Sequence, residues 1–449
     1  IFTSVNRDLQ TDNLKSLLSN QAYTFGLDGW TYLDEDETYV ITGSVIGSYT
    51  SGTEDYLIKL QNQPYRYMQR PDKIYMPLDS SLTSIGGYFS RVMLNKQKGN
   101  FYVNAALGII SPGFEYNDLG SQWMADKING HLVTGYRWYE PDDVFRNKSV
   151  YLGYSRTSDF EDNISRSGFY LNSNVQFLNY WGINFNTSYN FKSVSTTLTR
   201  GGPKLNIPSN ISFNFSAYSD SREKITFSPY VSYWENAIGS NEKYFGFDVE
   251  WKPNSQISFS IGPEYALNYT SYQWVGNFSD PQAISTYNTR YVFAQINQPT
   301  VSANIRLNWI FTPTLSLQLY MQPLISVGDY EDYRELNNPP TLDYKLYGNE
   351  GSTINFDSES QTYTVDPDAE GPAEQFSFDN PDFNFKSLRG NVVLRWEVLP
   401  GSVFYFAWTN SRTNFEDPGE FSFKNDFKNL VNSESDDIFL VKFSYWIDI

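Results

Sequence analysis

The sequence predicts an all-β fold: a transmembrane antiparallel β-barrel of about 18 strands, with short periplasmic turns and long extracellular loops. Three observations lead to this fold class. Apolar and polar side chains alternate along many segments, short and long connections alternate between these segments, and tryptophans gather beside the short connections. No stretch approaches the ~18 consecutive apolar residues of a membrane helix, and the mean hydropathy is −0.49. We therefore expect strands to cross the membrane.

The alternation is clearest over residues 181–191. Odd positions from Trp181 to Phe191 are apolar, aromatic or small, whereas even positions are polar or glycine. Because successive side chains of a strand point to opposite faces, one face is apolar and the other hydrated. The pattern recurs over segments 210–221, 244–251, 257–269, 301–309, 315–322 and 439–449. Counting in this way gives seventeen strands from Ala22 onward, with residues 1–6 as the tail of an eighteenth. One helix is predicted over 53–63, with Thr53 as its cap.

Short and long connections are expected at opposite ends of the strands. Short turns are predicted at 96–100, 178–181, 219–223, 252–255, 311–315 and 398–402. Long polar loops are predicted at 51–82, 111–127, 194–208, 273–286, 329–386 and 414–436. Strict alternation of this kind is typical of outer-membrane barrels. We expect residues 1–449 to form one barrel domain that lacks its first strands and an N-terminal module, with 329–386 as a long acidic extracellular loop within it.

Other all-β folds fit the pattern less well. A sandwich or jelly roll has shorter strands and no such bias in its loops, and a propeller would repeat every ~40 to 50 residues. A secreted β-helix would need short repeated rungs. Trp181, Trp251, Trp309 and Trp396 all lie beside short turns, where a membrane interface favours amphipathic rings. The apolar face is therefore expected to contact lipid.

Composition removes most catalytic chemistry. The chain has no cysteine and a single histidine, His131, so thiolate metal sites and most triads are excluded. The net charge of −18 argues against nucleic-acid binding. Carboxylate pairs such as Asp366 and Asp368, or Asp379 and Asp382, are interpreted as solvated loop charge. We expect no enzymatic activity and no cofactor, with Ca²⁺ in the acidic loops as the one alternative.

Charged residues on the polar faces indicate a wet interior, because an Arg or Lys facing lipid would cost ~2 to 4 kcal/mol. A barrel of ~16 to 18 strands is wide enough for an aqueous channel. The predicted lumen-facing residues are Lys192, Asp248, Glu250, Glu264, Arg306, Arg395 and Glu397.

Loop 329–386 is expected to be ordered and to act as a lid over the outer mouth. It combines acidic, proline-rich stretches with aromatic side chains that can fold back onto the barrel. The predicted anchors are Tyr344, Tyr347, Phe376, Phe378 and Phe383.

Several stretches resemble a family of outer-membrane barrels of unknown function, mainly from Bacteroidota, in which a family-nine carbohydrate-binding-like module precedes the barrel. The matching stretches are "TSVNRDL" (3–9), "YMQRPD" (67–72), "SPGFEYNDLGSQWMADKINGH" (111–131), "TRGGP" (199–203), "FSFDNPDFNFKSLRGNVVLRWEVLPGS" (376–402) and "LVKFSYWIDI" (440–449). The resemblance implies a barrel in the outer membrane, associated with a glycan-binding-like module. It supplies no catalytic residues.

Two functions remain open. The first is a pore or transporter that passes solutes, such as glycan fragments, across the outer membrane. The second is a structural or accessory subunit of a larger outer-membrane complex for secretion, surface display or barrel assembly, with a lumen closed by loops. The expected location is the cell outer membrane with a periplasmic C-terminus. Expected partners are outer-membrane lipid and lipopolysaccharide, with other outer-membrane or surface proteins as further candidates, and no nucleic acid.

Overall fold

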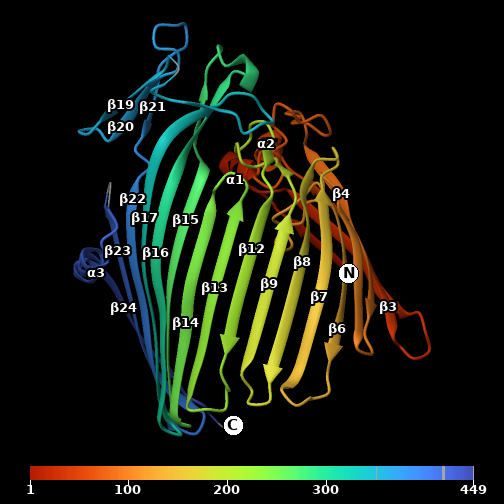
Figure 1. Ribbon diagram of the computed structural model, residues 1–449, viewed down its shortest axis with the longest axis vertical. Coiled ribbons are helices and arrows are strands. Elements are labelled where there is room, and N and C mark those ends of the chain that lie inside the picture. The colour runs from red at the N-terminus through yellow and green to blue at the C-terminus, as the bar shows by residue number, and fades with distance from the viewer. Residues whose placement is uncertain (350, 417–419, 448–449) are drawn as a thin grey trace.

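A computed structural model describes residues 1–349, 351–416 and 420–447. One antiparallel sheet of 19 strands dominates it (Figure 1). Eighteen strands follow one another as the wall, and the nineteenth, β18 (Tyr344–Leu346), is a short branch on β17. The predicted strand count is therefore confirmed, and Asp448 and Ile449 of the closing motif lie outside the described residues.

The first nine wall strands are β1 (Phe2–Asn6), β2 (Gln21–Tyr32), β3 (Tyr39–Ser51), β4 (Ser84–Lys96), β5 (Phe101–Ile110), β6 (Lys127–Trp138), β7 (Phe145–Ser158), β8 (Ile164–Phe177) and β9 (Gly182–Asn190). The other nine are β12 (Asn210–Tyr218), β13 (Ile225–Asn236), β14 (Asn241–Asn254), β15 (Ile257–Ser279), β16 (Thr289–Thr312), β17 (Leu315–Leu336), β22 (Phe383–Leu399), β23 (Ser402–Glu416) and β24 (Ser435–Ser444).

Each wall strand pairs antiparallel with the next one along the wall, so that β9 pairs with β12 and β17 with β22. In the described part of the chain, β1 pairs only with β2 and β24 only with β23. These two strands are the ends of the curved wall. Small sheets lie in the long connections: β10 (Ser193–Ser195) with β11 (Leu205–Ile207), and β19 (Thr353–Asp357) with β20 (Thr362–Asp366) and β21 (Phe376–Asp379).

The register gives the wall two different faces. Phe215 stands opposite both Phe185 and Val231, and Val231 stands opposite Phe245. The same apolar face carries Phe185, Phe213, Phe247, Phe259 and Leu317. Among the described residues, no second sheet covers this face; the small sheets belong to the long connections. The apolar face is thus the outside of a wall, not half of a sandwich core.

Short and long connections separate to opposite ends (Figure 1). The short-turn end includes 255–256, 313–314 and 400–401, and the four tryptophans predicted for the belt are exposed beside such turns. Two predicted loops were too long, because β15 runs to Ser279 and β17 to Leu336. The connection after β17 therefore spans 337–382 rather than 329–386. Register shifts between Thr270 and Gln273 and between Phe293 and Gln295 interrupt the period-two pattern at these extended ends.

The helices are short. The predicted helix is confirmed as α2 (Glu54–Gln61), where the Oγ1 of Thr53 accepts a hydrogen bond of 3.3 Å from the N–H of Tyr56. The sequence reasoning did not predict α1 (Asp12–Leu17), α3 (Phe423–Asn432) or the 3₁₀ turn η1 (Ile284–Thr286). Within the described ranges, no helix combines the length and apolar character needed to span a membrane.

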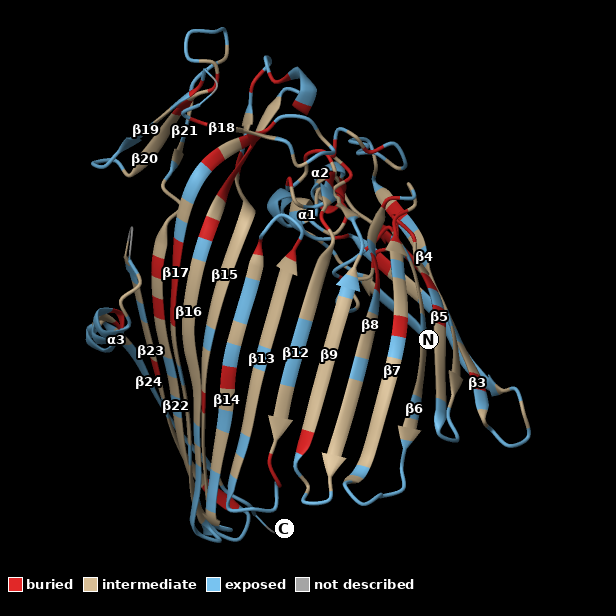
Figure 2. Ribbon diagram, in the orientation of Figure 1, coloured by how far each residue is buried: buried red, intermediate tan, exposed pale blue. Residues whose placement is uncertain are grey.

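Most buried side chains lie at the long-loop end (Figure 2). One buried cluster joins Leu57 and Leu60 of α2 to Met68 and to Ile85 of β4. Other clusters pack the long connections against the extended ends of β16 and β17. The protein's core therefore lies at one rim, where the long connections fold onto one another and onto the wall.

Candidate functional site

The inner face of the wall is lined by polar side chains that bond across strands. On β8, β9 and β12, Asn172 donates to Asn186 and Asn190 donates to Asn210 at 2.9 Å. Further charged residues follow on β14 to β17. Because neighbouring polar groups satisfy one another, this face forms a stable wet surface.

Three of the predicted lumen residues lie near one another on β14 to β16. The Glu264 carboxylate accepts hydrogen bonds from the hydroxyls of Tyr230 at 2.8 Å and Ser302 at 3.1 Å. A Cβ added at Gly262 would lie 2.2 Å from Oδ1 of Asp248, so this carboxylate covers the glycine. Arg306 stands opposite Ser260 on the next strand, with its guanidinium 5.1 Å from the ring centroid of Tyr320. Charges of both signs therefore share one patch of the inner wall.

The other four lumen candidates are more scattered. Glu250 accepts from Ser258 at 2.8 Å and pairs with Lys252 at 2.7 Å. Arg395 and Glu397 pair with each other at 2.9 Å near the short-turn end of β22. Lys192 was expected on a strand, but β9 ends at Asn190. It lines a rim cavity of about 740 Å³ instead.

Two connections fold together inside the rim, and residues 53–83 and 111–126 are here named the cover. Arg66 and Glu115 form an ion pair of 2.5 Å, with side chains that are 0% and 2% exposed. Lys73 pairs with Asp126 at 2.6 Å. Because Tyr65 is partly buried and lies beside the Glu115 carboxylate, its pKa is raised to about 12. The cover is therefore held by buried charge pairs.

The cover also bonds to neighbouring loops. Arg7, which follows β1, pairs with Asp118 at 2.6 Å. Glu161, in the connection after β7, lies 3.3 Å from Arg70 and accepts hydrogen bonds from the N–H groups of Ile74 and Tyr75 at 2.7 and 2.8 Å. Sequence reasoning missed these residues because it treated the loops as solvated. The one available signal was that several of them lie in or next to the motifs "YMQRPD" and "SPGFEYNDLG".

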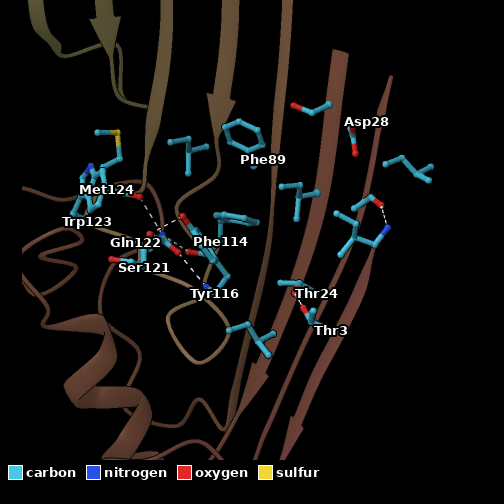
Figure 3. A pocket seen from close by; sticks show the side chains of 17 residues that line it. Thr3, Thr24, Asp28, Phe89, Phe114, Tyr116, Ser121, Gln122, Trp123 and Met124 are labelled. Atoms are coloured by element: carbon cyan, nitrogen blue, oxygen red, sulfur yellow. Dashed lines mark hydrogen bonds between the residues drawn. The ribbon is translucent and has the colours of Figure 1, made fainter. Parts of the chain in front are cut away.

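A cavity of about 480 Å³ lies between the cover and the inner face of β1 to β5 (Figure 3). Its apolar lining comes from the wall residues Ile46 and Phe89 and from the cover residues Phe114 and Met124. Trp123 is 74% exposed and borders both this cavity and a second one of about 510 Å³. The second cavity is lined by the basic residues Arg66, Arg70, Lys73 and Lys127, among others. The two cavities together place aromatic and charged groups side by side at the mouth.

The connection 337–382 rises beyond the rim on the tall side of the wall (Figure 1). Tyr347 is buried against Val292 and Ala294 of β16, and Phe376 and Phe378 pack against the same cluster. Tyr344 packs on Phe293, with ring centroids 5.4 Å apart. Phe383 begins β22 and lies across Gly328. The structure thus places the five predicted anchors against or within the wall.

His131 lies on the inner face, where its Nε2 is 2.6 Å from Oδ1 of Asn104. Across residues 1–349, 351–416 and 420–447, no group of three or more His, Asp or Glu side chains is placed to hold a metal ion. Among the carboxylates of 337–382, Asp382 accepts a hydrogen bond of 2.7 Å from the N–H of Tyr330 on β17, whereas Asp366 and Asp368 bond within the connection. Asp368, for example, accepts from the N–H of Ala373 at 3.0 Å.

Comparison with known proteins gives one family and several distant structures. The model of a family described as "Domain of unknown function (DUF5916)" matches residues 53–449. No curated protein matches the chain. The ferric enterobactin receptor PfeA is 10% identical to this chain with a TM-score of 0.41, and the match covers 92% of this chain and 68% of that one. A PfeA mutant from Pseudomonas aeruginosa is 9% identical with a TM-score of 0.42, and the match covers 92% of this chain and 67% of that one. The siderophore receptor PirA from Acinetobacter baumannii is 8% identical with a TM-score of 0.42, over 98% and 72% of the two chains.

Proposed function

The chain belongs to the DUF5916 family, and we propose that it forms the wall of a solute-conducting pore in an outer membrane. The observation that carries this proposal is the two-faced wall. Its outward face is apolar over neighbouring strands, and its inward face carries bonded asparagines and charges of both signs. A polar interior inside an apolar band is how membrane barrels provide an aqueous path.

The orientation is part of the proposal. Outer-membrane barrels place short turns in the periplasm and long loops outside, so the cover and 337–382 would face the exterior and the C-terminus the periplasm. The exposed tryptophans beside the short turns support a membrane interface at that end. Because lipid satisfies no backbone group, the proposal also requires that the edges of β1 and β24, which pair within the described residues only with β2 and β23, be bonded in the membrane.

Glycan fragments are the proposed solutes. Exposed aromatic rings bind the apolar faces of sugars while nearby polar groups bond to hydroxyls, and Trp123 lies between an apolar and a charged cavity. Origin in Bacteroidota and association with a carbohydrate-binding-like module, which the sequence resemblance implies, belong to the same proposal.

A second candidate is an accessory subunit of a larger outer-membrane complex. The observation that favours it is the cover, whose buried ion pairs hold two connections inside the rim. The β19–β21 sheet beyond the rim offers such a complex a surface, with Phe356 exposed on it. In this role, the lumen would stay closed and partner proteins would bind outside.

Planar-bilayer recording from the purified full-length protein tests both candidates. A pore gives stepwise conductance, and Arg306→Glu on the inner wall shifts its ion selectivity toward cations. Oligosaccharides added on the loop side reduce the current, and Trp123→Ala weakens that block. Absence of conductance, also after removal of residues 340–375, together with a co-purifying partner would overturn the pore and favour the accessory subunit.

A further inference from the structure

Helix α3 lies on the outside of the wall, at the long-loop end of β22 and β23 (Figure 1). Its wall-facing residues are Asp426 and Leu430, which are both buried. The Asp426 carboxylate accepts a hydrogen bond of 2.9 Å from Asn384 and lies 3.7 Å from Nζ of Lys386. Arg412 of β23 donates to the carbonyl of Val431 at 2.6 Å. Both ends of the helix are thus fixed to the wall.

The residues beneath α3 belong to the outward face. Lys386 stands opposite Ile325 on β17 and shares its face with Leu388 and Leu394 of β22. Its side chain is 0% exposed, and its Nζ lies 3.2 Å from a Glu416 oxygen and 2.9 Å from Oδ1 of Asn414. Since a bare lysine on this face would meet lipid, α3 both neutralises and covers it.

The height of α3 coincides with the end of the apolar band. Along β23, the outward positions run from Phe404, Phe406 and Trp408 to the polar residues Asn410 and Arg412. The Nε1 of Trp408 donates to Asp437 at 2.7 Å, which is the arrangement of an interfacial tryptophan. The helix therefore lies beside the level at which hydrocarbon gives way to headgroups.

One stripe of α3 is apolar and uncovered. Phe423, Phe427 and Val431 are 54%, 46% and 45% exposed, and their spacing of four residues aligns them along the helix. The rings of Phe423 and Phe427 stack with centroids 6.1 Å apart. Lys424 and Lys428 follow at the next angular position, are exposed, and pair with no carboxylate in the described ranges.

We propose that α3 is an interfacial anchor, an inference that rests on the membrane location given under the proposed function. Its phenylalanine stripe enters the acyl region next to the wall, and Lys424 and Lys428 bind the phosphates of the lipid headgroups above it. Two features identify lipid as the occupant: the stripe continues the apolar outer face of the wall, and the neighbouring lysines complement anionic headgroups. A second copy of the chain or a protein partner is the competing occupant.

Spin labels test the depth of the stripe, because the chain contains no cysteine and single substitutions label cleanly. The full-length protein in vesicles of phosphatidylcholine with lipid A carries a label at Phe427→Cys, at Asn425→Cys on the exposed polar side, or at Phe245→Cys on the wall. We expect oxygen to relax the labels at 427 and 245, and a water-soluble nickel complex to relax the label at 425.

The three labels separate two kinds of failure. If nickel reaches the wall label, the membrane location itself is wrong. If the wall label is shielded but nickel reaches the label at 427, the location stands and the anchor is wrong. Dipolar broadening between labels at 427 would show a second copy on the stripe and would also overturn the proposal.

A second experiment tests the lysines. Fluorescent lipid A is titrated into the detergent-solubilised full-length protein, and Lys424→Gln with Lys428→Gln is expected to weaken binding about 25-fold, since each interfacial lysine contributes about a five-fold factor. The matched control is Lys98→Gln with Lys224→Gln, which are exposed at the short-turn end. Equal effects of the two pairs, or none from the α3 pair, would contradict phosphate binding by α3.

Discussion

Replacement of Glu115 by leucine should loosen the cover. The Arg66 guanidinium has three acceptors: Glu115 at 2.5 Å, the Phe114 carbonyl at 2.6 Å and the Pro112 carbonyl. Glu115→Leu keeps both carbonyls but leaves a buried cation without its counter-charge, which costs about 3 to 5 kcal/mol. Since 1.4 kcal/mol is a factor of ten, detachment of the cover should become about two to four orders of magnitude more frequent.

Amide hydrogen exchange of segment 111–117 measures that frequency in the intact protein. The control is the pair Arg66→Met with Glu115→Leu, which removes both charges and loses about 1 kcal/mol for each of the two carbonyl bonds. We expect the double variant to exchange more slowly than Glu115→Leu alone, with a coupling of at least about 2 kcal/mol. Exchange that is unchanged by Glu115→Leu, or a double variant that shows the sum of both single effects, would refute the role of the ion pair.

Three further predictions concern the wall, the cover and the small sheet. Phe213→Arg should lower unfolding stability in lipid vesicles by ~2 to 4 kcal/mol, whereas Asn214→Arg on the inner face should change it far less; equal urea midpoints would mean that the faces are misassigned. Burial alone would raise the pKa of Glu161, but hydrogen bonds from the N–H groups of Tyr75 and Ile74 lower it below its usual value. Its stabilisation is therefore present at neutral pH and lost below about pH 4, so proteolysis of the cover should increase there, and less so in Glu161→Gln; equal acid sensitivity would disprove this. Val365→Ala, at a fully buried position, should loosen the β19–β21 sheet by on the order of 2 kcal/mol, seen as faster cleavage in 357–361; an unchanged rate would contradict its packing role.

The number of wall strands, their apolar and polar faces, and the separation of short turns from long loops could be predicted from the sequence. Apolar surroundings on one face and water on the other impose a period of two on every wall strand. The limits of β15 and β17 could not, since their extended ends, such as Gln273 paired with Ala294, are stabilised by clusters formed with the long connections and not by a lipid-facing alternation. The same holds for β18 to β21. Their pairing depends on contacts with Tyr333 and Val292 at the rim, not on local alternation.

The inner wall was partly predictable, whereas the cover was not. Asp248, Glu264 and Arg306 follow from strand parity, which fixes the face of each residue. Arg66 and Glu115 are far apart in the sequence, and nothing local distinguishes a buried loop charge from a solvated one. Helix α3 did leave a signal, because its apolar residues recur at helical spacing, although the polar composition of 414–436 predicts a loop.

The wall is not equally high all round. The 24 residues of β16 extend for about 80 Å and the nine of β12 for about 30 Å at ~3.3 Å per residue. About ten residues suffice to cross a bilayer, so in the proposed orientation β15 to β17 continue beyond the outer surface as a screen on one side, while β9 and β12 end close to that surface. Molecules that diffuse across the cell surface would meet the long strands from one direction and the low part of the rim from the other. Access to the mouth would thus be easier from the side of β9 and β12, because the strands there are shorter.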